Sequence, residues 1–161
     1  MPALSDAHRQ FLKGAHFAVV STIDFRGMPH QTVMWYALDG DDLLLSTPRD
    51  SIKHRHLKRD PRISVCVEQN YTYLTLSGMV ALDEDAGRAR ADYERLQKRY
   101  RRTIVPMIAG FILRGAFTWI RQLLKPPTID RGPKNSIQDL LSRERVTLHM
   151  KIDKVYGSGL S

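Results

Sequence analysis

The chain has 161 residues, of which 42% are hydrophobic and 26% charged, proportions that are ordinary for a globular protein and exclude a largely disordered one. Its 25 Lys and Arg residues against 17 Asp and Glu residues leave a net charge of +8, so we expect an anionic partner among nucleic acid, a membrane surface and a small polyanionic ligand. A single cysteine, Cys66, excludes a disulfide framework and a cysteine-rich zinc site.

The first residues contain no basic start followed by an apolar run. No secretory signal is therefore visible, and we expect a cytoplasmic protein. A short helix is predicted over residues 6–13, because Ser5 is a suitable N-cap and Gly14 stands just past the end.

Six segments have the composition or the alternating pattern of β-strands. They are residues 16–24, 29–38, 42–47, 62–69, 71–82 and 145–155. Asp39-Gly40 predicts a hairpin between the second and third segments. Because most of these strands follow one another in hairpin succession, we predict a mainly β (α+β) fold, a six-stranded antiparallel barrel whose closure removes exposed edges.

Helices are predicted over residues 51–58, from Asp83 to about residue 101, and over residues 103–124. The last is apolar nearly all round, but its longest uncharged run, 103–113, is well short of the roughly 20 residues that span a membrane. Three interpretations remain open: burial against a partner subunit or domain, a lid over a pocket, and contact of residues 103–125 with a membrane surface. We predict one domain, residues 1–161, in which residues 84–143 form a helical insertion.

The beginning of the basic helix is the most informative segment. Arg49 precedes its N-cap, Ser51, and Lys53 lies in its first turn, where the positive end of the helix dipole disfavours cations. An anion bound to the free N–H groups of this turn would relieve that conflict, with Ser51, Lys53 and Arg49 as ligands. The alternative is a solvated basic helix that binds nothing.

No metal site is predicted, because His54 and His56 do not share a helix face and no Cys, Asp or Glu cluster accompanies them. Both histidines are expected to be solvated. The chain contains neither a GxSxG elbow nor a GxGxxG or GxxxxGK[ST] motif, so a serine hydrolase, a Rossmann site and a P-loop have no support. Trp35 and Tyr36 are expected to pack in the core.

Several motifs occur in a characteristic order. They are Gly27-x-Pro29, Val33-Met34-Trp35-Tyr36, Asp39-Gly40, Ser51-Ile52-Lys53 and the run from Leu57-Lys58-Arg59-Asp60-Pro61 to Val65. Together they resemble the pyridoxamine-phosphate-oxidase-like split β-barrel superfamily. The Trp35-Tyr36 strand, the run from Lys53 to Arg62 and the strand 145–157 are most similar to its reductases that use the deazaflavin coenzyme F420. The resemblance covers residues 5–85 and 144–157 and does not explain the segment between them.

The resemblance implies an FMN-binding-like split barrel with peripheral helices, forming a homodimer with F420 at the subunit interface. The cofactor carries out hydride transfer to an unsaturated or conjugated small organic acceptor, and the motif fixes no catalytic side chain. The phosphate would lie against Ser51 and Lys53, and the ring along residues 31–35. The implied cofactor-binding residues are Gln31, Thr32, Val33, Met34, Trp35, Thr47, Arg49, Ser51, Ile52, Lys53 and Tyr73.

Two alternatives on the same fold stay open, an FMN-binding oxidoreductase and a non-catalytic carrier of flavin, deazaflavin or haem. Flavin oxidases of the superfamily tend to have an Arg-Lys pair where this chain has Ile52-Lys53, so one phosphate cation is missing here. The surplus positive charge suits the acidic tail of F420. Nucleic acid is not expected, because no recognition motif accompanies the charge.

Overall fold

The computed structural model describes residues 4–113 and 143–159, which form three helices and seven strands. In chain order these elements are α1 (Asp6–Leu12), β1 (Ala18–Ile23), β2 (Pro29–Met34), β3 (Tyr36–Asp39), β4 (Asp42–Pro48), α2 (Ile52–Arg59), β5 (Arg62–Gln69), β6 (Thr72–Asp83), α3 (Ala86–Leu113) and β7 (Arg145–Ser158). The Ser5 side chain caps α1 by accepting a hydrogen bond from the His8 N–H, as predicted.

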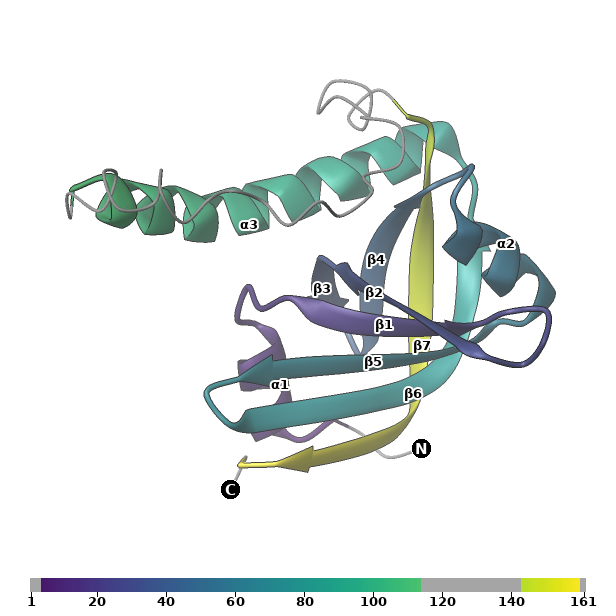
Figure 1. Ribbon diagram of the computed structural model, residues 1–161, viewed down its shortest axis with the longest axis horizontal. Helices are drawn as coiled ribbons and strands as arrows, with labels where there is room; N and C mark the ends of the chain where they lie inside the picture. Colours follow the sequence, from purple (N-terminus) through teal and green to yellow (C-terminus); the bar gives the residue numbers. More distant parts are fainter. Residues whose placement is uncertain (1–3, 114–142, 160–161) are drawn as a thin grey trace, which may run out of the picture.

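The seven strands form one antiparallel sheet with the order β2-β1-β5-β6-β7-β4-β3 (Figure 1). Its two edge strands, β2 and β3, are consecutive in the chain and separated only by Trp35. Two opposite edges can meet at one residue only if the sheet curls round on itself, so this connection makes the sheet a barrel that is split between β2 and β3. The mainly β barrel is confirmed.

The prediction of six strands was wrong, because the segment 29–38 is two strands. β2 pairs with β1, whereas β3 pairs with β4 through the hairpin at Asp39-Gly40. The chain must leave one edge of the sheet and join the other, and it bends at Trp35 to do so. Local residue pattern carries no sign of this bend, since both halves favour extended backbone.

The core fills the inside of the barrel. Alternate residues of β5 and β7 are buried, as their patterns predicted, and they meet the inward side chains of β1, β4 and β6. The buried hydrophobic residues of β5 and β7 are Ile63, Val65 and Val67, with Val146, Leu148, Met150 and Ile152, and Thr147 of β7 is buried as well. Leu12 of α1 and Leu57 of α2 complete the same cluster.

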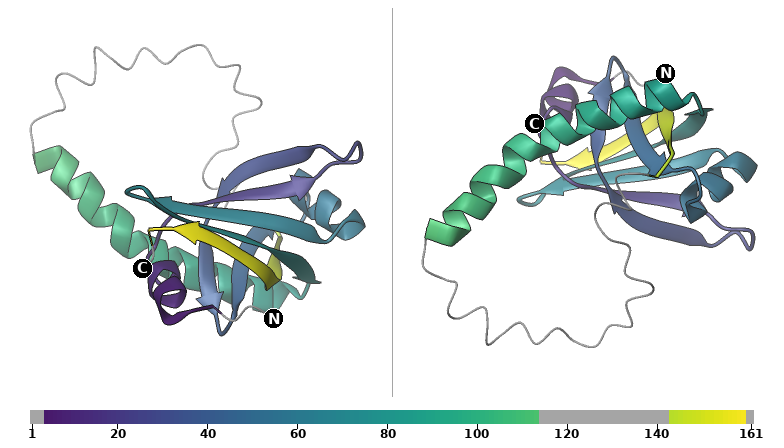
Figure 2. Two further views of the ribbon diagram at one scale, coloured as in Figure 1. Left: turned by 90° about the horizontal axis from the view of Figure 1, so that it is seen from below. Right: turned by 90° about the horizontal axis from the view of Figure 1, so that it is seen from above.

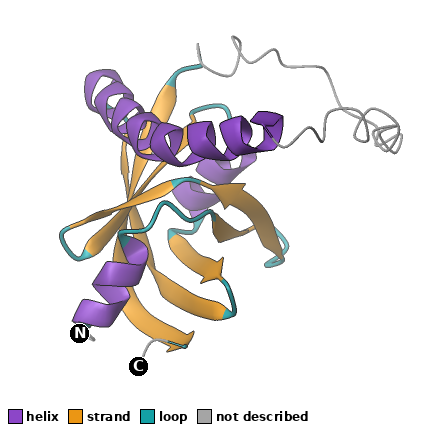
Figure 3. Cartoon of the chain, turned by 90° about the vertical axis from the view of Figure 1, so that its left-hand side faces the viewer, coloured by secondary structure: helices purple, strands orange, loops and turns teal. Residues whose placement is uncertain are grey.

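The helices lie around the outside of the sheet (Figure 3). α3 crosses one side of the barrel, where it contacts β7 and β4, and its C-terminal part runs on past the strands (Figure 2). α3 continues without a break from Ala86 to Leu113. The predicted break between separate helices over 83–101 and 103–124 was therefore wrong. The remaining residues of the predicted apolar helix, up to 125, lie outside the described residues.

Asp85, rather than the predicted Asp83, caps α3, because its carboxylate accepts a hydrogen bond from the Arg88 N–H at 2.8 Å. Within the described residues, no helix is long and apolar enough to cross a membrane.

A β-bulge interrupts the pairing of β6 with β7 between Ser77 and Gly78. A Cβ atom at Gly78 would collide with the carbonyl group of Lys151 in the neighbouring strand. Gly78 therefore allows two backbones to approach at the point where the long strand bends.

We predict that Gly78→Ala lowers the free energy of unfolding by about 1–3 kcal/mol, because backbone atoms cannot move aside for the added methyl group. Gly87→Ala is the control: in the first turn of α3, its Cβ would meet only Asp85 Oδ1, at 3.4 Å, so stability should stay equal or rise. Urea unfolding measures both variants. Equal stabilities would contradict the assigned role of Gly78.

Candidate functional site

A cavity of about 380 Å³ opens where the barrel closes, between the corner at Trp35, the end of β4 and the side of α3. One wall is apolar, and the opposite wall carries hydroxyl groups and two cations. The lining residues are Phe17, Val33, Met34, Trp35, Ser46, Thr47, Pro48, Lys53, Tyr93, Leu96 and Arg145. A concave site that combines apolar surface with a few polar groups is typical of cofactor binding.

Tyr100 of α3 braces the aromatic part of the apolar wall. Its ring stacks on Trp35 with centroids 5.1 Å apart and an interplanar angle of 13°, and it lies 5.8 Å from the ring of Phe17. The Tyr100 hydroxyl donates to the His16 carbonyl and accepts from the Tyr36 N–H. Burial raises the pKa of Tyr100, so this hydroxyl stays protonated and holds the wall in place.

The polar wall contains two half-buried cations, Lys53 of α2 and Arg145 of β7. Neither has an ion pair with a carboxylate in the part of the chain that the structure describes. Burial lowers the pKa of both groups, and the charge of Arg145 lowers that of Lys53 further. The wall is therefore a positive surface without a counter-ion of its own among these residues.

The Ser51 side chain caps α2, as the sequence predicted. Its Oγ accepts a hydrogen bond from the His54 N–H at 3.2 Å and lies 2.9 Å from the Thr47 hydroxyl. Ser51 thus fixes the first turn of α2 against the end of β4 and places Lys53 at the cavity. Lys53 of the predicted anion-binding helix start lies at the cavity, whereas the Ser51 oxygen accepts a hydrogen bond from the helix.

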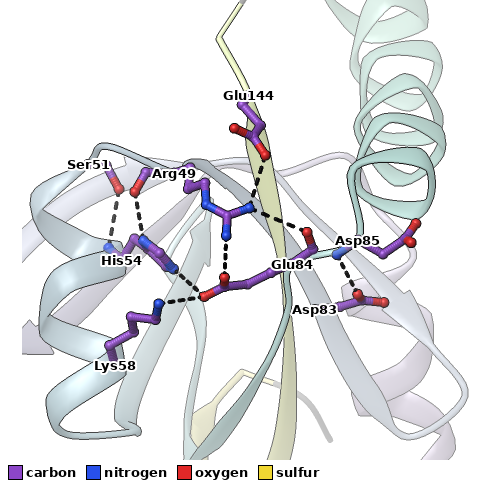
Figure 4. A network of polar contacts seen from close by, with 8 residues as sticks. All are labelled: Arg49, Ser51, His54, Lys58, Asp83, Glu84, Asp85 and Glu144. Atoms are coloured by element: carbon purple, nitrogen blue, oxygen red, sulfur yellow. Dashed lines mark hydrogen bonds and ion pairs between the residues drawn. The ribbon is translucent and has the colours of Figure 1, made fainter.

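Arg49 does not line the cavity, because two carboxylates hold it elsewhere (Figure 4). Its guanidinium lies 2.6 Å from Glu84 Oε2 and 2.9 Å from Glu144 Oε1. Glu84 also pairs with Lys58 at 2.9 Å and with His54 at 3.1 Å. Hydrogen bonds from Lys58 and His54 lower the pKa of Glu84, which keeps it charged at the centre of this network.

The expectation that His54 and His56 are solvated was wrong, because both are buried. His54 lies between the carbonyl of Arg49, 2.6 Å from Nδ1, and Glu84. His56 Nδ1 lies 3.0 Å from the Thr22 hydroxyl, and its ring meets that of His30 edge-on. Both histidines join α2 to the sheet. Among the described residues, no three His, Cys, Asp or Glu side chains are grouped to hold a metal ion.

The structure brings five of the eleven predicted binding residues to the cavity: Val33, Met34, Trp35, Thr47 and Lys53. Besides Arg49 and Ser51, four lie elsewhere. Gln31 is exposed and donates a hydrogen bond to Ser21, Thr32 is half-buried, and Ile52 and Tyr73 are 47% and 43% exposed.

Sequence reasoning missed six cavity residues: Phe17, Ser46, Pro48, Tyr93, Leu96 and Arg145. A signal existed for α3, where Ala89, Tyr93, Leu96 and Tyr100 recur at helical spacing within a charged segment. That spacing indicates a face that packs on the barrel, and this face covers the cavity. The insertion that the resemblance left unexplained therefore supplies one wall of the site.

A family model described as pyridoxamine 5'-phosphate oxidase matches residues 4–123. The chain belongs to this family. The family resemblance predicted from the sequence is confirmed, and the pyridoxamine 5'-phosphate oxidase family includes oxidoreductases whose fold binds flavin-type cofactors.

Solved structures share the fold at low sequence identity. An F420 reductase is 20% identical, with 92% of this chain and 94% of that chain covered and a TM-score of 0.62. A conserved hypothetical protein from Mycobacterium tuberculosis is 21% identical, with 95% and 83% covered and a TM-score of 0.62. A heme binding protein from Mycobacterium smegmatis is 16% identical, with 99% of this chain but 55% of that chain covered and a TM-score of 0.60. No curated protein matches the chain.

The buried His56 generates a prediction for stability against pH. Burial, followed by the nearby His30 and Arg59, lowers the pKa of His56 below its ordinary value of 6.5. As pH falls, the unfolded chain takes up this proton before the folded protein does, so stability declines from about pH 6.5 down to the folded-state pKa. His56→Asn keeps a partner for Thr22 but cannot take up the proton.

Urea unfolding between about pH 7.5 and about pH 5 should therefore show a steeper loss of stability in the wild type than in His56→Asn. Parallel curves for the two proteins would contradict the role assigned to His56.

Proposed function

We propose that the protein is an F420H2-dependent oxidoreductase that binds the deazaflavin coenzyme in the cavity beside Trp35 and reduces an unsaturated or conjugated small organic acceptor. The observation that supports this best is the pairing of an aromatic wall with two half-buried cations that have no counter-ion among the described residues. A ligand with a flat ring and a phosphate group would pack its ring against the aromatic wall and pair its phosphate with the two cations.

The proposal gives the residues of the cavity separate tasks. Val33, Met34 and Trp35 would bind the ring along β2, and Lys53 would bind the phosphate with the Thr47 hydroxyl beside it. Phe17 and Leu96 would exclude water from the ring. When bound, the coenzyme supplies the hydride chemistry, and the chain positions it and shapes the space for the acceptor.

The choice of F420 over FMN rests on two observations. An F420 reductase has the same fold over almost the full length of both chains, and the net charge of +8 suits a ligand that carries several negative charges. FMN and a non-catalytic carrier role are the competing outcomes of the first test below.

We also propose that the protein is a homodimer. Three large apolar residues, Phe17, Val19 and Val33, are 51%, 40% and 65% exposed, and Val19 and Val33 face each other across the β1–β2 pair. Phe17 and Val33 also line the cavity. A second copy placed over this patch would bury it and close the apolar side of the site.

We predict that Lys53→Gln weakens F420 binding by about 10- to 100-fold, because it removes a charge-assisted contact worth about 1.5–3 kcal/mol. Coenzyme fluorescence titration, run beside FMN, measures the affinity. Arg55→Gln is the matched control: it removes one positive charge from an exposed position of the same helix, outside the cavity, and should leave the affinity within a few-fold of wild type.

If Lys53→Gln bound F420 with the affinity of the wild type, the role of Lys53 in binding the coenzyme phosphate would be contradicted. Binding of FMN but not F420 by the wild type would make the protein an FMN oxidoreductase. Tight F420 binding without hydride transfer to any of a panel of conjugated acceptors would favour a carrier.

For the dimer, we predict that Val19→Glu shifts the mass measured by light scattering from two chains to one, because a carboxylate would be buried at the interface. Gln10→Glu adds the same charge on α1 and should leave the mass unchanged. A wild-type protein with the mass of one chain would contradict the proposal.

A further inference from the structure

Arg145 is the least expected residue of the cavity. It is the first residue of β7 and lies opposite Pro48 at the end of β4. Sequence analysis treated it only as part of a strand, and the motif that suggested a phosphate site lies in α2, nearly a hundred residues earlier in the chain. The pairing of β4 with β7 brings Arg145 to the cavity that Lys53 of α2 also lines.

Two contacts hold the Arg145 guanidinium in a fixed position. Its Nε donates a hydrogen bond to Ser46 Oγ at 3.0 Å, and its central carbon lies 3.7 Å from the centroid of the Tyr93 ring. These contacts orient the group and leave its terminal nitrogens without a hydrogen-bond partner among the described residues. Terminal guanidinium N–H groups in a fixed plane match the geometry of a phosphate.

Carboxylates in the same region are engaged by other groups. Glu144, the preceding residue, lies 2.9 Å from Arg49, and Asp92 accepts a hydrogen bond from Thr147. Other arginines of the same region, such as Arg49 and Arg90, are paired with carboxylates. Arg145 thus differs from its neighbours in having no such partner in the described part of the chain, although it is half-buried.

Two cations that share one half-buried cavity repel each other and lose hydration. A packing role for Arg145 would need neither the second cation nor the open terminal nitrogens. A phosphate group between the two would reduce the repulsion and accept their hydrogen bonds.

We infer that Lys53 and Arg145 together bind one phosphate group, so that Arg145 of β7 supplies the second phosphate cation that Ile52 does not. This inference rests on the proposed function, because it assigns the phosphate of the proposed coenzyme to these two residues. It shifts the phosphate away from the capped Ser51 and towards β7 and α3. It also makes Arg145 a residue that selects phosphate-bearing ligands over the same ring system without phosphate.

The test compares Arg145→Gln with wild type on two pairs of ligands. Each pair consists of a phosphate-bearing cofactor and a form without phosphate: F420 with its deazariboflavin core, which also lacks the acidic tail, and FMN with riboflavin, which differ in the phosphate alone. Arg145→Gln should weaken binding of the phosphate-bearing ligand by about 10- to 100-fold. The affinity for the phosphate-free ligand should stay within a few-fold of that of the wild type. Arg145→Lys keeps the positive charge, so its affinity for the phosphate-bearing ligand should fall less than that of Arg145→Gln. Arg90→Gln, which removes a paired and exposed charge, should bind like wild type.

If Arg145→Gln loses affinity equally for both members of a pair, Arg145 is a structural residue and the inference is overturned. Wild-type affinity of Arg145→Gln for the phosphate-bearing ligands would also overturn it. Arg145→Lys provides the same comparison where Arg145→Gln does not fold. Inorganic phosphate separates this inference from the proposed function. If wild type binds neither cofactor but phosphate raises its melting temperature and not that of Arg145→Gln, the function fails and the phosphate site stands. No response to phosphate and no cofactor binding would overturn both.

Discussion

The closure of the sheet at Trp35 is the constraint on which the rest of the structure depends. One residue separates two strands that lie at opposite edges of a seven-stranded sheet, so the sheet must curl until those edges meet. The strands do not hydrogen-bond to each other there, and the cavity opens beside this split. Trp35 is half-buried at this corner and stacks on Tyr100 of α3. The same bend that closes the barrel therefore supplies the aromatic wall of the site.

The cations around α2 and the cavity fall into two groups. Arg49, which precedes α2, and Lys58, in its last turn, are held by Glu84, with His54 as a third member of the network (Figure 4). That network fastens α2 to the end of β6 and keeps these cations out of the cavity. Lys53 and Arg145 form the other group, without carboxylates among the described residues. A high net charge thus indicates an anionic ligand only after its paired part has been set aside.

Local pattern predicted most of the fold. The alternation in β5 and β7, the Asp39-Gly40 hairpin and the Ser51 cap depend on residues near in sequence, and all are present. Features that depend on distant partners could not be predicted. His56 is buried because of Thr22, 34 residues away, and Arg145 reaches Ser46 across 99 residues. The bend at Trp35 follows from closure of the whole sheet, which no local window contains. The site was half predicted for this reason: β2 and α2 carry motifs, whereas α3 and β7 contribute through tertiary packing.

The ionisation of Lys53 is the most direct test of whether a ligand phosphate neutralises the cations at the mouth of the barrel. NMR of the lysine side chains can follow the Lys53 ammonium through its titration in the free protein and with saturating F420. We expect the pKa of Lys53 to lie below its ordinary value of 10.5 in the free protein, because of burial and Arg145, and to rise when the phosphate binds. A Lys53 that titrates at its ordinary value and does not respond to bound coenzyme would contradict the account.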